Sequence, residues 1–244
     1  DRSMRPSIAL YAIAAFLCSS QQVWAAPDAP DVPWSAPATT VVTIEDRRFT
    51  SAGAELSGQL YLPRSSKPVA AIVVTHSASS PLGSASLYDH LKTALPALGI
   101  AVFTYDRRGS GRSGTKDAGG NFSILADDAI AAANSLKADP RIDPRRIGTW
   151  GLSQGGWISP LAASRSPDIA FVISVSAPVV TADVQMIFSS TNHLRANGYA
   201  RTDIDQMVAT RKAVDDYMRG TASKDDAQRM IDSAKTKPWF KYLY

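Results

Sequence analysis

The sequence is poor in cysteine and histidine, the residue types on which most metal sites and thiol enzymes depend. Of 244 residues, one is a cysteine, Cys18, and three are histidines, His76, His90 and His193. No two of the histidines have the spacing of metal ligands. Cys18 lies in an N-terminal segment that we expect to be removed. We therefore predict a mature chain with no disulfide, no thiol nucleophile and no metal.

The sequence also lacks a strong excess of charge of either sign. It has 26 Lys and Arg against 22 Asp and Glu, a formal net charge of +4, and no basic run of five or more. This balance is too mild to indicate a nucleic-acid partner. A hydrophobic content of 45% in 244 residues is enough to bury the core of one large domain.

The N-terminus has the pattern of an export signal. Met4 and Arg5 give a basic start, residues 7–20 are mostly apolar, and 23–25 (Val-Trp-Ala) offer small residues for cleavage. An anchoring helix and a lipid-modified Cys18 are the alternatives, but the apolar run is shorter than the ~20 residues of a membrane span. We expect residues 1–25 to be a cleaved signal peptide. This predicts an exported protein, periplasmic or secreted, without a stable membrane span.

Apolar runs that favour strands alternate with helical segments after a Pro/Ala-rich linker at 26–40. A continuous apolar run indicates a strand buried on both faces, as in a parallel sheet covered by helices. Strands are predicted at 69–75, 100–105, 147–150 and 170–176, after a hairpin of 41–44 and 54–62, with helices at 87–98, 126–137 and 154–165. The order predicts an α/β fold with a mostly parallel sheet and flanking helices over residues 41–182.

Charges and prolines suggest where two of these elements begin. Asp127 and Asp128 would lie at the start of the 126–137 helix and Lys137 at its end, which would match the helix dipole. Pro140 and Pro144 are expected to break the chain before the strand at 147.

From residue 183 onward the pattern changes to amphipathic helices. One helical face carries Val184, Ile187, Phe188 and Thr191, and two further apolar faces follow within 204–218 and 227–234. We expect residues 183–244 to form a helical cap or lid.

The chemistry is expected at Gly-x-Ser-x-Gly, residues 151–155, which follows a strand and opens a helix. Such a turn pushes the hydroxyl of Ser153 out above the end of the sheet, and the glycines remove side chains from a tight bend. The N–H of Gln154 lies at the helix N-terminus, where it could stabilise an oxyanion. This predicts a serine hydrolase with Ser153 as the nucleophile.

A second oxyanion donor is expected from the loop 75–81, which follows a buried strand. The backbone N–H of Ala78 or Ser77 could serve, and the alternative is a polar surface loop. His76 is more simply explained as a structural residue that hydrogen-bonds within this loop than as a base.

The segment 106–114 contains Gly-x-Gly-x-x-Gly after a strand, a pattern that can indicate dinucleotide binding. That motif should open a helix at once, whereas this one continues into a polar, glycine-rich stretch. We favour a structural turn held by Asp106 and an arginine, with Arg107 and Gly109 in the turn.

The predicted site also requires a base. A serine nucleophile needs a histidine, and a carboxylate to orient it, in the chain order Ser, acid, His. After Ser153 the sequence offers Asp183 and His193. Both are weak candidates, because His193 lies in a predicted cap helix and is more simply explained as a solvated residue.

The sequence resembles the α/β-hydrolase superfamily in three segments: 75–77 (Thr-His-Ser), 106–113 (Asp-Arg-Arg-Gly-Ser-Gly-Arg-Ser) and 151–156 (Gly-Leu-Ser-Gln-Gly-Gly). Segments 139–148 and 157–163 resemble its dienelactone hydrolase and prolyl-peptidase-like branch, in which Pro160 belongs to the pattern. The chain departs in having Ser77 where the family usually has glycine. The resemblance implies an acid and a histidine after two further strands, beyond Tyr244, so the fold and cap would be incomplete here.

These observations predict a hydrolase that cleaves an ester or related acyl bond of a small-molecule or peptide substrate, without a cofactor. Within the same fold a peptidase or a thioesterase remains open, because the lid and the pocket set the preference for the leaving group. The alternative of another class is a catalytically silent, truncated domain that binds a hydrophobic ligand or a partner.

Overall fold

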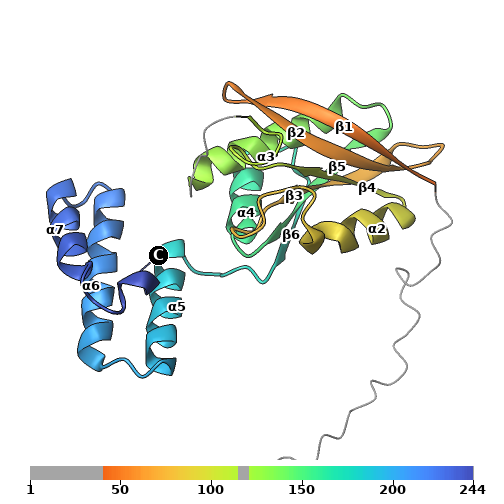
Figure 1. Ribbon diagram of the computed structural model, residues 1–244. Helices are drawn as coiled ribbons and strands as arrows, with labels where there is room; N and C mark the ends of the chain where they lie inside the picture. Colours follow the sequence, from red (N-terminus) through yellow and green to blue (C-terminus); the bar gives the residue numbers. More distant parts are fainter. Residues whose placement is uncertain (1–40, 115–120, 244) are drawn as a thin grey trace, which may run out of the picture. The chain divides into compact units, whose positions relative to one another are not determined.

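The structure, a computed structural model, describes residues 41–114 and 121–243 (Figure 1). The predicted signal peptide and linker lie outside the described residues, and so does Cys18. The polar, glycine-rich stretch that continues the 106–114 segment also lies outside them, at residues 115–120.

Six strands in this part of the chain form one sheet with the order β1-β2-β4-β3-β5-β6. The first two form the predicted antiparallel hairpin, and β2 pairs antiparallel with β4. The pairs β3–β4, β3–β5 and β5–β6 are parallel. The strands are β1 (Val42–Ser51), β2 (Ala54–Pro63), β3 (Val69–Thr75), β4 (Ile100–Tyr105), β5 (Ile142–Leu152) and β6 (Phe171–Val175). The predicted α/β class with a mostly parallel sheet is confirmed.

Both faces of the sheet are covered by helices. Ala71 and Val73 of β3 belong to the apolar cluster shared with α3 (Phe122–Lys137) and α4 (Gly155–Arg165). The alternate residues Ile72 and Val74 belong to a second cluster, shared with α2 (Asp89–Ala97) and the short 3-10 helix η2 (Ser86–Tyr88) before it. This alternation explains why β3 is a continuous apolar run.

Strand β5 begins earlier than predicted, and it contains Pro144. Its pairing with β3 places Ile142 opposite Val69 and Ile147 opposite Ala71, so residues 143–146 form an irregular stretch. A proline costs little where the regular ladder is already interrupted. The expectation that Pro144 breaks the chain before the strand is therefore wrong.

Helix α3 also begins earlier than predicted, because Asn121 caps it. The Asn121 side-chain oxygen accepts hydrogen bonds from the backbone N–H groups of Ser123 and Ile124. Asp127 and Asp128 consequently lie beyond the first turn, so the helix-dipole interpretation of these two residues is wrong. Asp128 is fully buried and has a specific partner, Arg108.

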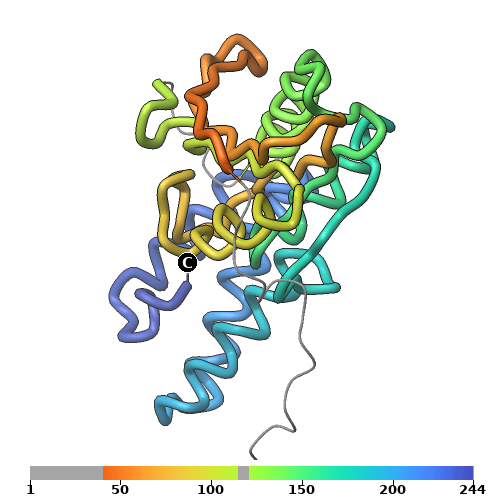
Figure 2. The backbone as a smooth tube through the Cα atoms, turned by 90° about the vertical axis from the view of Figure 1, so that its right-hand side faces the viewer, coloured from red at the N-terminus to blue at the C-terminus, as the bar shows by residue number. Residues whose placement is uncertain are grey.

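The three helices predicted after residue 183 are present: α5 (Ala182–Ala196), α6 (Arg201–Met218) and α7 (Lys224–Ala234), followed by the 3-10 turn η3 (Phe240–Tyr242). The chain reverses direction between α5 and α6 (Figures 1 and 2). Their shared core consists of Leu194, Ile204, Met207, Ala234, Trp239 and Leu243.

The apolar face predicted on α5 is not buried in the described structure. Val184 is 49% exposed and Phe188 is 63% exposed. Leu194, which was not among the residues named for that face, is the α5 residue buried in the cap core. No helix in the described ranges is long and apolar enough to cross a membrane.

Candidate active site

The turn between β5 and α4 carries Ser153 in an unusual backbone conformation. Ser153 has φ = 54° and is exposed, in the left-handed region that non-glycine residues seldom adopt. Its N–H donates to the carbonyl oxygen of Val175 on β6 at 3.1 Å, and its own carbonyl accepts from Gly156 N–H at 2.8 Å. The neighbouring strand and the helix thus hold the strained residue in place.

Three glycines allow the strand, turn and helix to pack this tightly. A Cβ on Gly151 would overlap the carbonyl of Gly155 and lie 2.6 Å from Thr75 Oγ1. One on Gly155 would overlap the backbone carbonyl of Thr75, and one on Gly156 would overlap Ala177. Each glycine is required by close approach of backbone to backbone or to a side chain.

Thr75, the last residue of β3, joins that strand to the turn. Its Oγ1 lies 3.2 Å from the carbonyl oxygen of Trp150, 3.1 Å from that of Gly155 and 2.7 Å from Ser159 Oγ. A hydroxyl has one proton, so Thr75 can share its proton between the two carbonyl oxygens only where the Ser159 hydroxyl donates to Thr75 Oγ1. Sequence reasoning missed Thr75, because nothing local distinguishes it from any threonine at the end of a strand.

The structure places the N–H of Gln154 at the start of α4. Gln154 is the N-cap residue of this helix, and among the described residues its N–H makes no hydrogen bond. An unpaired N–H one residue after the serine, at the positive end of a helix dipole, can stabilise negative charge on a bound oxygen.

The two predicted oxyanion donors in the loop after β3 differ in burial and in hydrogen bonding. Ser77 is buried, and its N–H donates to the hydroxyl of Tyr88 at 3.0 Å. Ala78 is exposed, and in the described structure its N–H has no acceptor. The geometry therefore favours Ala78 over Ser77 as the second donor.

His76 is buried and lies against β4. Its Nε2 is 2.5 Å from the carbonyl oxygen of Tyr105, and its ring packs edge-on against the Tyr105 ring. Burial lowers the pKa of His76 from 6.5 to about 4, so the ring is neutral at pH 7. The residue is structural, as expected, but it bonds the neighbouring strand rather than its own loop.

Asp106 holds two loops together beside the end of β4. Its Oδ1 accepts from Gly83 N–H at 3.0 Å and its Oδ2 accepts from Arg112 N–H at 2.8 Å. A Cβ on Gly111 would overlap this carboxylate. Packing against Asp106 explains why Gly111 of the Gly-x-Gly-x-x-Gly pattern is a glycine, with no bound phosphate required.

The other predicted turn residues lie in the same loop. Arg107 is buried, and its backbone N–H donates to the carbonyl oxygen of Pro81 at 2.8 Å. Gly109 has φ = 76°, a conformation that favours glycine.

A buried ion pair next to this loop was not predicted. Arg108 donates from Nε to Asp128 Oδ2 at 3.1 Å and from an Nη to the carbonyl oxygen of Ser51 at 3.0 Å. It joins the β1–β2 hairpin to α3. A buried carboxylate at a core-facing helix position was the available signal, because such a group needs a charged partner.

The two weak candidates for acid and base both lie in the cap helices. Asp183 pairs with Arg219, the C-cap residue of α6, and a hydrogen bond from Thr181, with the Arg219 charge among the smaller causes, lowers its pKa. His193 is exposed, and its ring contacts the Tyr242 ring at 4.5 Å between centroids. The Ser153 hydroxyl makes no hydrogen bond to either residue, nor to any other residue of the described ranges.

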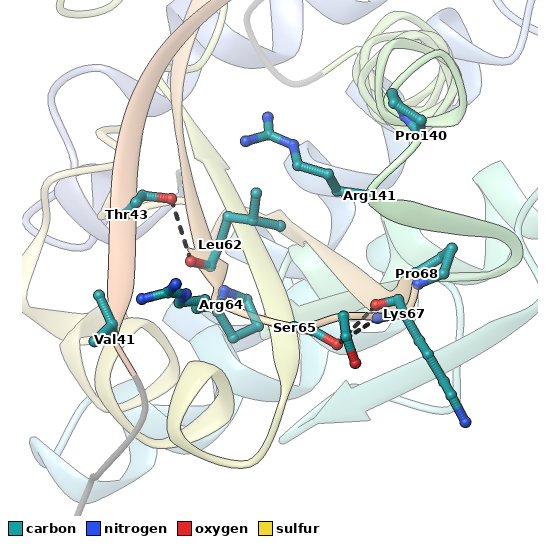
Figure 3. Close-up of a pocket in the computed structure, with 11 residues that line it drawn as sticks. Val41, Thr43, Leu62, Arg64, Ser65, Lys67, Pro68, Pro140 and Arg141 are labelled. Atoms are coloured by element: carbon teal, nitrogen blue, oxygen red, sulfur yellow. Dashed lines mark hydrogen bonds between the residues drawn. The ribbon is translucent and has the colours of Figure 1, made fainter.

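A cavity of about 500 Å³ in the described part of the chain lies away from Ser153. Figure 3 shows the cavity between residues 41–43, residues 62–68 at the end of β2 and in the loop after it, and residues 140–141. The Arg141 side chain extends from the segment before β5. These segments lie at the amino ends of β3 and β5, whereas Ser153 follows the carboxyl end of β5. In open α/β sheets ligands bind at the carboxyl ends of strands, so this cavity is not the reaction site.

Within 41–114 and 121–243 no cluster of three or more His, Cys, Asp or Glu residues could hold a metal ion. The chemistry of the described site consists of an exposed hydroxyl and two unpaired backbone N–H groups.

A strained serine between a parallel strand and a helix, with a second N–H after the neighbouring strand, defines the α/β-hydrolase fold. The sequence model of the serine aminopeptidase family S33 matches residues 66–233, well over half of the chain. The protein belongs to this family of α/β-hydrolases, and the predicted superfamily is confirmed.

Individual relatives cover part of the chain. It is 35% identical over 129 residues to the thiohydrolase apmlB of Arthrinium phaeospermum, covering 52% of this chain and 41% of that protein. It is 31% identical over 124 residues to the monoglyceride lipase of Rattus norvegicus, covering 50% and 39%. The chain thus spans about two fifths of these relatives' length.

Among solved structures, the α/β hydrolase GrgF from Penicillium sp. sh18 aligns with a TM-score of 0.51 and 26% identity, covering 63% of this chain and 54% of that one. A hypothetical protein, PA2218 of Pseudomonas aeruginosa, aligns with a TM-score of 0.53 and 19% identity, covering 82% and 65%. The second likeness shows the fold alone.

Proposed function

We propose that this protein is a serine hydrolase that cleaves an ester or a related acyl bond through an acyl-enzyme on Ser153. The observation that carries the proposal is the backbone at Ser153: an exposed serine with φ = 54° on a strand-to-helix turn. Such strain persists where surrounding structure imposes it, and it often marks a reactive residue.

In the proposed reaction, Ser153 Oγ attacks the carbonyl carbon of the substrate and transfers its proton to a base. The carbonyl oxygen becomes an oxyanion that accepts hydrogen bonds from the N–H groups of Gln154 and Ala78. The base returns the proton to the leaving group as the acyl–leaving group bond breaks. A water molecule then attacks the acyl-enzyme in the same way and releases the acid.

We propose that the base is a histidine, oriented by a carboxylate, and that both lie beyond Tyr244 in a longer protein. Two observations support this placement over Asp183 and His193. Asp183 is paired with Arg219, and His193 packs on Tyr242. The chain also spans about two fifths of its curated relatives, which leaves room for the missing residues.

The acyl bond is proposed to be an ester or a thioester, with a peptide bond as the alternative. Relatives bear the names thiohydrolase and monoglyceride lipase, while the family takes its name from an aminopeptidase. Export through a cleaved signal at residues 1–25 stays a prediction.

The test is covalent labelling of the full-length protein with a fluorophosphonate, followed by turnover of a p-nitrophenyl ester, an acyl thioester and an aminoacyl p-nitroanilide. Ser153→Ala should abolish labelling and lower turnover at least about a thousandfold. Ser164→Ala is the matched control, because this serine is exposed on the same helix and bonds only the carbonyl oxygen of Leu161. Labelling that persists in Ser153→Ala would overturn the proposal.

A catalytically silent domain that binds a hydrophobic ligand or partner is the second candidate. The exposed apolar side chains of α5, with Val184 49% and Phe188 63% exposed, favour it. Ester turnover by the 244-residue chain itself, lost in Ser153→Ala, would rule it out.

A further inference from the structure

The loop that follows β3 contains a tight turn at residues 77–80. Ser80 N–H donates to the carbonyl oxygen of Ser77 at 3.2 Å, which closes the turn. Neither central residue, Ala78 or Ser79, has a positive φ, which fits a type I turn. Ala78 is thus an exposed residue of a short, closed loop, and its N–H has no acceptor among the described residues.

A single tyrosine hydroxyl forms hydrogen bonds to both ends of this turn. Tyr88 Oη accepts the N–H of Ser77 at 3.0 Å and donates to the carbonyl oxygen of Ser80 at 2.7 Å. Tyr88 is fully buried. Burial raises the pKa of its hydroxyl, so the donated proton stays in place at neutral pH.

The ring of Tyr88 contacts both the loop after β3 and strand β5. It packs edge-on against His76, with ring centroids 6.0 Å apart, and against Trp150, 6.2 Å apart. Trp150 lies on β5, directly before the turn that carries Ser153. Tyr88 thus contacts both the strand that ends in the nucleophile and the loop that carries the second donor.

We propose that Tyr88 is a positioning residue for the oxyanion hole: its hydroxyl takes up the Ser77 N–H and fixes the 77–80 turn so that the Ala78 N–H serves as the second oxyanion donor. The inference rests on the proposed function and deepens it. Tyr88 touches no reacting atom, so it acts through the placement of Ala78.

Removal of the Tyr88 hydroxyl should weaken stabilisation of the transition state more than binding of the substrate. Loss of a whole oxyanion donor costs about 10²–10³ in kcat, and a loosened donor costs less. In the full-length protein, Tyr88→Phe should lower kcat about 10- to 100-fold while KM changes less than about twofold. Tyr61→Phe is the control, because its hydroxyl bonds Gln59 Oε1 at 3.2 Å outside this loop.

The affinity for a tetrahedral inhibitor distinguishes a role in the oxyanion hole from a merely structural role. A trifluoromethyl ketone forms an adduct with Ser153 whose oxygen occupies the oxyanion hole, whereas the carboxylic acid product binds without one. Tyr88→Phe should weaken the ketone by the same factor as kcat/KM and leave product inhibition unchanged. Equal weakening of both ligands would show a general disturbance of the site and overturn the proposal.

Ala78→Pro tests the donor directly and does not depend on the fold tolerating Tyr88→Phe. Proline is favoured at the second position of a type I turn and has no N–H. The variant should lose kcat about 10²–10³-fold with a wild-type melting temperature, while Ala78→Gly, which keeps the N–H, should stay within about threefold.

The outcomes separate the two proposals. If Ser153→Ala keeps its activity, the proposed function fails. If Ser153→Ala is inactive but Tyr88→Phe and Ala78→Pro turn over at the wild-type rate, the function stands and the role of Tyr88 and Ala78 is wrong.

Discussion

At the scale of single residues, Thr75 connects the end of β3 to the turn that holds Ser153. Its Oγ1 lies within hydrogen-bond distance of two backbone carbonyl oxygens and of Ser159 Oγ, all in the buried seam between β3, β5 and α4. The Ser159 hydroxyl is buried and bonds Thr75 Oγ1, and a buried polar group that loses its partner costs about 1–3 kcal/mol. Stability of the elbow therefore depends on a side chain from another strand.

We predict that Thr75→Val lowers the free energy of unfolding by about 1–3 kcal/mol, as measured by urea denaturation. Valine matches the shape of threonine, so the loss reports the hydroxyl. Thr43→Val, on an exposed strand position with a long 3.4 Å bond to the Leu62 carbonyl oxygen, should change stability by less than about 0.5 kcal/mol. Equal effects in the two variants would contradict this role of the Thr75 hydroxyl.

The buried ring of His76 makes stability depend on pH. Its pKa is lowered from 6.5 to about 4 by burial, so between these values the unfolded chain binds a proton that the folded chain does not. Its contribution is present above pH 6.5 and is lost as pH falls to about 4. The loss amounts to about 3 kcal/mol at about 1.4 kcal/mol per pKa unit.

We therefore predict a flatter dependence of unfolding free energy on pH, between 6.5 and 4, in His76→Gln than in the wild type. Carboxylates titrate in both proteins and cancel in the comparison. His90→Gln, which replaces an exposed histidine in the same way, is the control for the substitution itself. Parallel curves for wild type and His76→Gln would show that His76 does not titrate differently on folding.

At the scale of elements, the approach of α4 to β5 and β3 depends on the absence of side chains. Gly151→Ala would place a methyl group on the Gly155 carbonyl and 2.6 Å from Thr75 Oγ1. The Gly155 carbonyl follows Ser153 in the turn, so relief of this overlap would displace Ser153 itself.

We expect Gly151→Ala to cost at least about 2 kcal/mol in unfolding free energy and to slow fluorophosphonate labelling of Ser153. The matched control is Gly114→Ala, where an added Cβ meets nothing within 4 Å, with an expected change within about 0.5 kcal/mol. Wild-type stability and labelling in Gly151→Ala would show that the elbow can relax at little cost.

At the scale of the whole molecule, the sheet has one apolar outer strand in its described part. β6 pairs with β5 on one side, and its side chains Phe171 and Ile173 are 36% and 40% exposed. An apolar strand with a free edge is a template for pairing with another chain.

We predict that the 244-residue chain self-associates and that Ile173→Lys reduces this, because a charge on an edge strand opposes strand addition. Sedimentation velocity measures the outcome. Val179→Lys adds the same charge at a fully exposed position after β6 and should have a smaller effect. A monomeric wild type, or equal effects of the two lysines, would contradict the prediction.

The sequence by itself determined the class of the fold and the place of the strand-to-helix turn that carries Ser153, since both rest on local patterns. Apolar runs mark strands that are buried on both faces, and Gly-x-Ser-x-Gly marks the strand-to-helix turn that the structure shows at Ser153 with φ = 54°. The same local reasoning misplaced Pro144 and Asp128, because a bulge in β5 and the burial of α3 depend on pairing with distant segments.

Only the tertiary structure decided how the site is held and which N–H groups are left unpaired. Thr75 reaches partners 75 to 84 positions away, and Arg108 meets Asp128 from a neighbouring loop. The choice of Ala78 over Ser77 depends on Tyr88, whose hydroxyl already occupies the Ser77 N–H. A hydrogen bond between segments has no sequence signature, because any residue of that type could make it until folding selects its neighbours.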